Sequence, residues 1–308
     1  MLFPTQVMMS TIGVLQEHLD NPDVNEVMVV EGGNVWLEDA HGLHPAGQLN
    51  PDQISQCIEH ICRASGRRVD LLSPILDARL HDGSRACVVL PPISLGGCTI
   101  NIRKFSRRIL PLAAFGPSAC TDILKHVIHE RMNVVVSGAT SSGKTSLLSA
   151  AASHFCSSER LVVVEDTAEL RFNNSHVVRL QTRPANSENL GELTLQQLVR
   201  TSLRLRPDRL IVGEVRGAEA IDMLMALTTG HRGSWATVHA TSARDTVSRL
   251  AAMITRDSPQ WSHEQSQELA TSALDAIVYI ERLPNGRRHI SEILHITKDS
   301  MQSLYEAT

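Results

Sequence analysis

The chain has 308 residues, of which 42% are hydrophobic and 20% charged, and this composition predicts a globular protein of about two domains. The net charge of −4 and the aromatic content of 3% argue against a surface that binds nucleic acid through basic charge or base stacking. The apolar runs fall short of the roughly 18 residues of a membrane span, and segment 1–21 lacks the basic start and apolar stretch of a signal peptide.

Cysteine usage favours a reducing compartment. The cysteines form no CxxC pair, and several lie in apolar surroundings. We therefore expect reduced thiols, buried as small hydrophobic side chains, in a cytosolic protein; a metal site is the weaker alternative. The positions are Cys57, Cys62, Cys87, Cys98, Cys120 and Cys156.

Residues 1–108 predict a smaller mixed α/β domain. Apolar positions at helical spacing indicate a helix over 5–19, and a strand follows at 25–30. The Gly-Gly of EGGNVWLED indicates a hairpin turn. Asn50 is the expected N-cap and Pro51 the first residue of another helix. The apolar stripe of that helix consists of Ile54, Cys57, Ile58, Ile61 and Cys62, and further strand candidates are ILDARL, RACVVL and CTINIRKF.

The second half of the chain has a different pattern of apolar residues. The segment SRRILPLAAFGPSACT separates the halves, and we take 109–118 as a linker and 119–308 as the second domain. Short apolar runs then alternate with helical patterns: NVVVSG, LVVVED, HVVRLQ, DRLIVGE, SWATVHA and AIVYIERL. Such runs predict a mainly parallel sheet covered on both faces, an α/β fold in which ligands bind at the carboxyl ends of the strands. The Asn-Gly of ERLPNGRRHISEILHI predicts a final hairpin.

The stretch GATSSGKTS lies between the apolar strand NVVV and the helical pattern that starts at TSLLSAAA. Its glycines allow backbone N–H groups to turn toward phosphate oxygens, and the helix directs its positive end to the same place. Lys144 is expected to reach the β- and γ-phosphates and Thr145 to offer its hydroxyl to Mg²⁺. The alternative is a turn that merely contains a lysine. The predicted nucleotide-binding residues are Gly138, Ala139, Thr140, Ser141, Ser142, Gly143, Lys144, Thr145 and Ser146.

Carboxylates follow two other strand candidates of this half. Glu165, Asp166 and Glu169 come after LVVV, and Glu214 comes after RLIVG. A glutamate at a strand end is able to polarise the attacking water or to hold Mg²⁺ through water. We expect Glu165 and Glu214 to act in this way beside Lys144; the alternative is carboxylates that are only solvated.

Two histidines flank the strand candidate SWATV. His231 follows Gly230, and His239 ends the strand. A histidine at a strand end is able to sense a γ-phosphate or to hydrogen-bond to an acidic residue across the site. We expect both histidines at the nucleotide and a catalytic role for His239; the alternative for each is a structural histidine.

Four blocks in this order resemble the secretion ATPase superfamily, which powers type II and type IV secretion, conjugation and type IV or Flp pili. They look like its Walker A motif (138–145), Asp box (165–170), Walker B motif (208–216) and His box (230–241). The combination of VVVEDTAEL, RLRPDRLIVGEVRG and TGHRGSWATVHATS is specific to this superfamily. The N-terminal segments VNEVMVVEGGNVWLED, DGSRACVVLPPIS and INIRKF resemble its conjugation-type branch of TrbB and CpaF proteins.

The resemblance implies a RecA-like P-loop domain preceded by a domain that closes over the nucleotide. Arg85 in DGSR and Arg103 in NIRKF match positions that approach the phosphates in this branch; the alternative for each is a surface salt bridge. Arg232 and Ser234 depart from the proline and glycine that many members have in the His box. The tetracysteine zinc motif of the type II enzymes is missing from the sequence.

The resemblance also implies which residues perform the reaction. We expect an ATPase that binds ATP and Mg²⁺, with Glu169 and His231 among the residues at the nucleotide. The expected catalytic residues are Glu214, Glu165, His239 and Lys144. The expected Mg²⁺ ligands, partly through water, are Thr145, Glu165 and Glu214.

As a member of this superfamily the chain is expected to form a homohexameric motor at the cytoplasmic face of the inner membrane, with membrane components of a secretion, conjugation or pilus machine as partners. We expect one of Arg204, Arg206 and Arg209 to face the adjacent subunit, and no sequence-specific binding of nucleic acid. The alternative is an ATP-dependent switch or scaffold without turnover. A nucleic-acid helicase is less favoured, and stimulation of ATPase activity by single-stranded DNA would reveal it.

Overall fold

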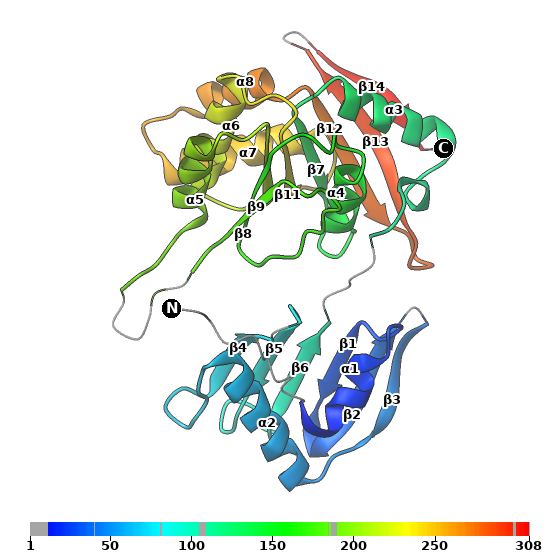
Figure 1. Cartoon of the computed structure of the whole chain (residues 1–308), viewed down its shortest axis with the longest axis vertical. Helices are drawn as coiled ribbons and strands as arrows, with labels where there is room; N and C mark the ends of the chain where they lie inside the picture. The colour runs from blue at the N-terminus through cyan, green and yellow to red at the C-terminus, as the bar shows by residue number, and fades with distance from the viewer. Residues whose placement is uncertain are drawn as a thin grey trace. The chain divides into compact units, whose positions relative to one another are not determined.

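The computed structural model describes residues 12–39, 41–80, 82–104, 109–183, 185, 190–297 and 300–307. The chain divides into two compact units between residues 107 and 108 (Figure 1). Residues 5–11 of the helix predicted over 5–19 lie outside the described residues; the described part forms a 3-10 turn, η1 (Gly13–Leu15), and the short helix α1 (Gln16–Asp20).

The first unit is built on a six-stranded antiparallel sheet in the order β3-β2-β1-β6-β5-β4. Its strands are β1 (Glu26–Val29), β2 (Asn34–Asp39), β3 (Gly42–Gln48), β4 (Ile75–Arg79), β5 (Arg85–Val89) and β6 (Thr99–Arg103), with the 3-10 turn η2 (Glu31–Gly33) between β1 and β2. The predicted β1–β2 hairpin is confirmed. The edge strand β3 was not predicted, because it contains a proline and two glycines and is largely exposed.

Helix α2 (Pro51–Ser65) packs on one face of this sheet. Asn50 caps it as predicted: its side chain accepts a hydrogen bond from the Gln53 backbone N–H, and the Gln53 side chain accepts one from the Asn50 N–H. Cys57 and Ile61 of the predicted stripe are buried against the inward-facing residues of β1, β2, β5 and β6. The alternation of buried and exposed residues along these strands leaves the core on that face.

The second unit is built on an eight-stranded sheet in the order β14-β13-β12-β7-β11-β10-β8-β9. Strands β12, β7, β11, β10, β8 and β9 pair in parallel, and β13 and β14 extend the sheet antiparallel. The bounds are β7 (Val134–Gly138), β8 (Leu161–Glu165), β9 (Val177–Gln181), β10 (Arg209–Val215), β11 (Trp235–His239), β12 (Ala276–Arg282), β13 (Arg288–Ile296) and β14 (Met301–Glu306). The six predicted parallel strands and the final hairpin are therefore confirmed, and only β14 was not predicted.

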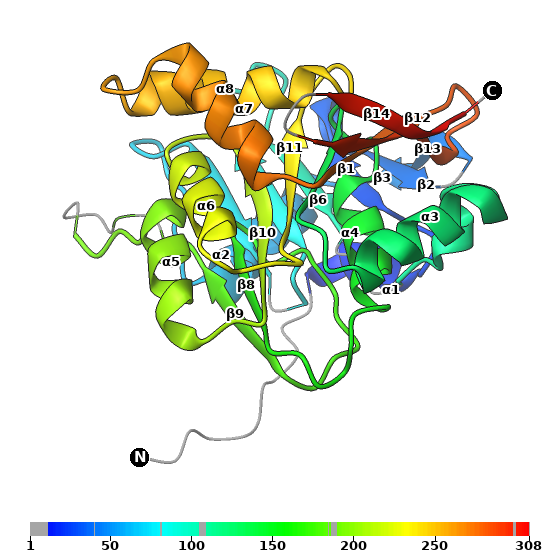
Figure 2. The ribbon, with the colours of Figure 1, turned by 90° about the horizontal axis from the view of Figure 1, so that it is seen from above.

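Helices cover both faces of this sheet (Figure 2). Helices α3 (Ser118–His129) and α4 (Lys144–Ala152) share one core cluster with Val134 and Val136. The opposite cluster includes Val135 and the remaining helices. These are α5 (Leu195–Ser202), α6 (Glu219–Thr228), α7 (Asp245–Asp257) and α8 (His263–Ala273), with the 3-10 turn η4 (Leu203–Leu205) after α5. Because successive residues of β7 face opposite layers, all five residues of this strand are buried, as expected for a parallel strand between two helical layers.

The whole segment predicted as a linker, 109–118, belongs to the second unit. It contains the 3-10 turn η3 (Leu112–Ala114), and Leu112 and Phe115 are buried in the cluster of α3 and α4. The predicted closure of the first unit over a nucleotide stays a prediction.

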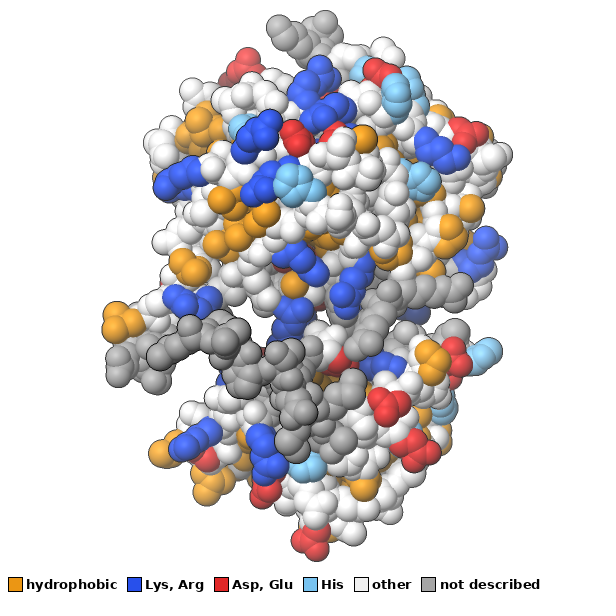
Figure 3. Space-filling view, viewed as in Figure 1, with side chains coloured by type: hydrophobic (Ala, Val, Ile, Leu, Met, Phe, Trp, Pro, Cys, Tyr) orange, Lys and Arg blue, Asp and Glu red, His pale blue; other side chains and the backbone are white. Residues whose placement is uncertain are grey.

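All six cysteines are free thiols. Cys57 and Cys120 are buried, as predicted, whereas Cys156 is exposed, because it lies in the turn between α4 and β8 rather than on an inward face. Every helix in the described ranges is too short or too polar to cross a bilayer. On the face drawn in Figure 3, basic side chains are scattered, with acidic ones between some of them, in keeping with the small net charge.

Candidate active site

The glycine loop joins β7 to α4 at the carboxyl edge of the second sheet, as predicted. Gly138 ends the strand, and a Cβ placed on it would lie 2.2 Å from the carbonyl oxygen of Ile280 on β12. Gly143 precedes the helix with φ +104°, and a Cβ there would lie 2.5 Å from Cδ of Arg288. Both positions therefore require glycine, one because of a close approach and the other also because of its left-handed backbone.

The side chain of Lys144 folds back into this loop. Its Nζ donates to the carbonyl oxygens of Gly138 at 3.0 Å and Ala139 at 2.7 Å and lies 3.2 Å from Nδ1 of His239. Burial lowers the pKa of Lys144 to about 8. Ser142, also buried in the loop, has a hydroxyl oxygen with no hydrogen-bond partner in the described structure. A buried ammonium on neutral acceptors and an orphaned hydroxyl fit a loop that receives phosphate oxygens.

His239 and Glu214 meet the loop from the neighbouring strands. The register of β7 and β11 places His239 opposite Gly138, and Nε2 of His239 lies 2.6 Å from Oε1 of Glu214 on β10. An ammonium only donates, so Nδ1 of His239 accepts from Lys144 and the ring proton lies on Nε2, facing Glu214. Lys144, His239 and Glu214 thus form one continuous chain of polar contacts, and these three predicted catalytic residues are brought together.

Arg216 completes this arrangement. Its guanidinium donates to Oε2 of Glu214 at 2.6 Å and lies 3.9 Å from a carboxylate oxygen of Asp166. Burial raises the pKa of Glu214, but the hydrogen bond and charge of Arg216, together with His239 and Lys144, outweigh it and hold this pKa below its usual value. Burial and the charge of Lys144 lower the pKa of His239. At neutral pH the site therefore contains an ionised glutamate beside a neutral imidazole.

Glu165 serves a different purpose from Glu214. It ends β8 and is only 3% exposed. One carboxylate oxygen accepts hydrogen bonds from the backbone N–H groups of Glu169 and Leu170, both at 2.7 Å, and the other accepts from Arg179 at 3.1 Å. Burial raises the pKa of Glu165, and these hydrogen bonds oppose that shift. Both oxygens face protein donors, so these contacts hold the loop after β8; the contact of Glu165 with water or Mg²⁺ stays a prediction.

His231 lies away from the predicted nucleotide. It precedes β11, whereas His239 ends that strand, so the two histidines lie at opposite edges of the sheet. Nδ1 of His231 is 3.1 Å from the carbonyl oxygen of Ala226 at the end of α6. The strand β11 separates His231 from the glycine loop by its full length. The contact of His231 with a nucleotide stays a prediction.

Arg85 and Arg103 belong to the first unit, where the register of β5 and β6 places them opposite each other. Arg103 also lies opposite Glu26 of β1. Both arginines are exposed. Their contact with a nucleotide bound to the second unit stays a prediction.

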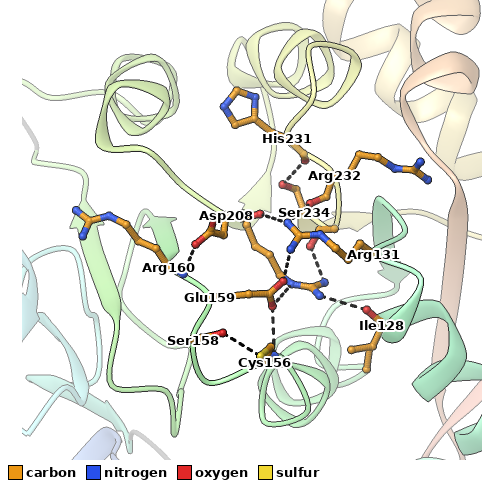
Figure 4. Close-up of polar contacts among 12 residues, drawn as sticks. Ile128, Arg131, Cys156, Ser158, Glu159, Arg160, Asp208, His231, Arg232 and Ser234 are labelled. Atoms are coloured by element: carbon orange, nitrogen blue, oxygen red, sulfur yellow. Dashed lines mark hydrogen bonds and ion pairs between the residues drawn. The ribbon is translucent and has the colours of Figure 1, made fainter.

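The amino edge of the second sheet carries a buried ionic network (Figure 4). Glu159 accepts hydrogen bonds from Arg209 at 2.7 Å and from Arg131. Arg209 is 3% exposed, also donates to the carbonyl oxygens of Gly233 and Ile128, and lies over the ring of Phe155. Arg209 therefore joins four segments of its own subunit, which contradicts its candidacy as an arginine that faces the adjacent one.

Sequence reasoning did not single out Arg216 and Arg288. Arg216 stands two positions after Glu214, so its neighbourhood was visible in the sequence. Arg288 begins β13, far along the chain from the glycine loop, and its contact with Gly143 arises only when the final hairpin folds over that loop.

Known proteins resemble this chain in sequence and fold. The sequence model of the family described as type II/IV secretion system protein matches residues 11–285. The conjugal transfer protein TrbB of Rhizobium radiobacter is 34% identical over 288 residues, which cover 90% of this chain and 85% of TrbB. The VirB11 ATPase from the Brucella suis type IV secretion system, in complex with sulphate, is 28% identical with a TM-score of 0.52, over 91% of this chain and 92% of VirB11. The Legionella pneumophila ATPase DotB is 20% identical with a TM-score of 0.69, over 97% and 84% of the two chains.

These likenesses confirm the predicted fold class: a RecA-like P-loop domain with a mainly parallel sheet, preceded by a smaller α/β domain. They also confirm the resemblance to the secretion ATPase superfamily and its TrbB-like branch. The chain belongs to the type II/IV secretion system protein family.

Proposed function

We propose that this protein binds ATP and Mg²⁺ at the loop 138–146, hydrolyses ATP with Glu214, and acts as one subunit of a hexameric motor for type IV secretion or conjugative transfer. The observation that carries this proposal is the chain of contacts from Lys144 through His239 to Glu214. It links the residue expected at the phosphates to the residue expected at the attacking water.

Binding would change the partners of Lys144. In the structure its ammonium is held by two backbone carbonyls and His239, and phosphate oxygens carry more negative charge than these neutral acceptors. The backbone N–H groups at the start of α4 and the orphaned hydroxyl of Ser142 would add further donors.

Mg²⁺ would be held by the hydroxyl of Thr145 in the first turn of α4, with Glu214 reaching it through water. The ion would supply charge that stabilises the phosphoryl group during transfer. Both groups offer oxygen ligands, which this ion prefers.

Hydrolysis would depend on the ionised carboxylate of Glu214. Arg216 holds the pKa of Glu214 low, so this side chain is able to accept a hydrogen bond from water and to orient it toward the γ-phosphate. The other carboxylate oxygen, Oε1, lies 2.6 Å from Nε2 of His239 and accepts no hydrogen bond within the described residues. An ionised Glu214 is suited to position and polarise water at neutral pH. A protonated carboxylic acid would be less suited to that role.

The names of two relatives support a proposal for where the protein works. TrbB is named as a conjugal transfer protein, and VirB11 as the ATPase of a type IV secretion system. A corresponding role for this chain would bring its ring to the cytoplasmic side of the inner membrane, with membrane components of the machine as partners. The alternative is a switch that binds ATP at the same residues and recruits partners without turnover.

The test is phosphate release from ATP by the wild type and by Lys144→Ala, with and without single-stranded DNA. We expect Mg²⁺-dependent turnover in the wild type, loss of it in Lys144→Ala, and no stimulation by DNA. ATP binding without turnover would support the switch, strong DNA stimulation would support a helicase, and equal activity of the two proteins would contradict the site.

A further inference from the structure

The C-terminal hairpin of β12 and β13 packs directly on the glycine loop. Both glycines of the loop contact it: Gly138 through the carbonyl oxygen of Ile280 and Gly143 through the side chain of Arg288. The aliphatic stem of Arg288 occupies the space that any side chain at position 143 would need. The second glycine of the loop therefore makes room for an arginine as well as for a phosphate.

The guanidinium of Arg288 lies at the beginning of α4. Its Nη1 donates to Oγ of Ser146 at 3.3 Å, and Ser146 lies in the first helical turn, where backbone N–H groups have no partner within the helix. The side chain is half-buried, whereas that of the preceding Arg287 is exposed. The hairpin thus brings one of its two adjacent arginines to the loop and leaves the other in solvent.

Two sources of positive potential lie together at this point: the N-terminal end of α4 and the guanidinium of Arg288. Both attract negative charge, so the arrangement favours a phosphate oxygen bound at the start of this helix. A guanidinium also matches phosphate oxygens with two parallel donors, which an ammonium does not.

We propose that Arg288 is a phosphate-binding residue of this site: its stem holds Gly143, and its guanidinium is shared between Ser146 and an oxygen of the nucleotide's phosphates. The inference rests on the proposed function, since it concerns the same loop. It assigns to the C-terminal hairpin a part in binding the nucleotide, in addition to its part in closing the sheet.

Binding of ADP with Mg²⁺ to the full chain, followed by calorimetry at several salt concentrations, tests this role. Arg288→Met keeps an unbranched stem over Gly143 and removes the charge, so we expect about tenfold weaker binding and a flatter dependence of affinity on salt than in the wild type. Arg288→Lys keeps the charge without the fork and should bind with intermediate affinity. Arg287→Met, the matched control, should bind within about twofold of the wild type.

The outcomes separate the two proposals. If the wild type binds ADP, Lys144→Ala does not, and Arg288→Met binds like the wild type, Arg288 has no phosphate contact and this inference is overturned while the site stands. If Arg288→Met and Arg288→Lys lower affinity equally with the salt dependence of the wild type, the residue only supports the loop, and the inference is again overturned. If the wild type itself does not bind ADP, the proposed function fails with it.

Discussion

Nζ of Lys144 and Nδ1 of His239 lie 3.2 Å apart, and this contact connects the glycine loop to the end of the neighbouring strand β11. The other nitrogen of the same imidazole faces Glu214 at 2.6 Å. A phosphate bound in the loop would draw the ammonium of Lys144 away from Nδ1 of His239. The position and protonation of the imidazole beside Glu214 would then change. The structure thereby provides a direct path by which nucleotide binding could prepare the carboxylate for hydrolysis.

The affinity for ADP should fall as pH rises above about 8. Burial lowers the pKa of Lys144 to about 8 in the nucleotide-free chain, and the negative charge of bound phosphates would raise it again. Below that pH the ammonium is already present; above it, binding must take up a proton, which weakens affinity by at most about tenfold per pH unit. His239, whose pKa is lowered, stays neutral across this window.

Calorimetry in buffers of different ionisation enthalpy would measure both the affinity for ADP and the proton uptake. A range from about pH 7.5 to about pH 9.5 spans the Lys144 pKa of about 8. Lys144→Arg serves as the control, because its guanidinium remains charged throughout. If the affinity of the wild type for ADP did not change with pH, the lowered pKa of the buried Lys144 ammonium would be contradicted.

Glu165→Gln should reduce the free energy of unfolding by about 1–3 kcal/mol, because an amide cannot satisfy the donors that surround this buried carboxylate. The exposed Glu268→Gln should change that free energy by less than about 0.5 kcal/mol. Urea unfolding measures both variants. Full stability together with abolished hydrolysis in Glu165→Gln would instead identify Glu165 as the residue that acts on water.

Arg209→Met should destabilise the second unit by about 3–5 kcal/mol, because it removes one of the two arginines that pair with the buried carboxylate of Glu159 and orphans two carbonyl contacts. Arg131→Met should cost less, since 42% of the Arg131 side chain is exposed. Urea unfolding of the two variants compares them directly. Equal free energies of unfolding for the two would mean that burial of Arg209 does not decide the strength of this network.

The proposed ring should assemble in a concentration-dependent manner, and Mg²⁺ with a non-hydrolysable ATP analogue should strengthen it. A ligand that binds the assembled form preferentially shifts the population toward it by mass action. Light scattering measures the mass. If only monomer is found at roughly tens of micromolar protein with saturating analogue, the result would favour the monomeric switch.

The sequence predicts those parts of the site that depend on contiguous residues or on the geometry of parallel strands. The loop 138–146 is one uninterrupted motif, and Glu214 and His239 end neighbouring strands, so their convergence follows from the carboxyl edge of the sheet. His231 precedes β11 and therefore lies at the opposite edge of the sheet from Gly138, a separation that follows from which end of the strand it adjoins.

The remaining features depend on tertiary contacts. Whether Glu165 faces water or its own loop is decided by the backbone of residues 169 and 170, which turns back over the carboxylate. The burial of Arg209 requires segments from three other places in the chain to meet around it. Arg288 reaches Gly143 only because β13 folds over the loop, a contact that no local pattern specifies.

Glu214→Gln, compared with the wild type for both ADP binding and ATP turnover, tests the central claim most directly. The amide keeps the shape of the side chain and removes the charge that Arg216, His239 and Lys144 stabilise. We expect binding within a few-fold of the wild type and turnover lower by a factor on the order of 10² or more. Turnover at the wild-type rate in a variant that binds normally would contradict the assignment of Glu214 to the attacking water.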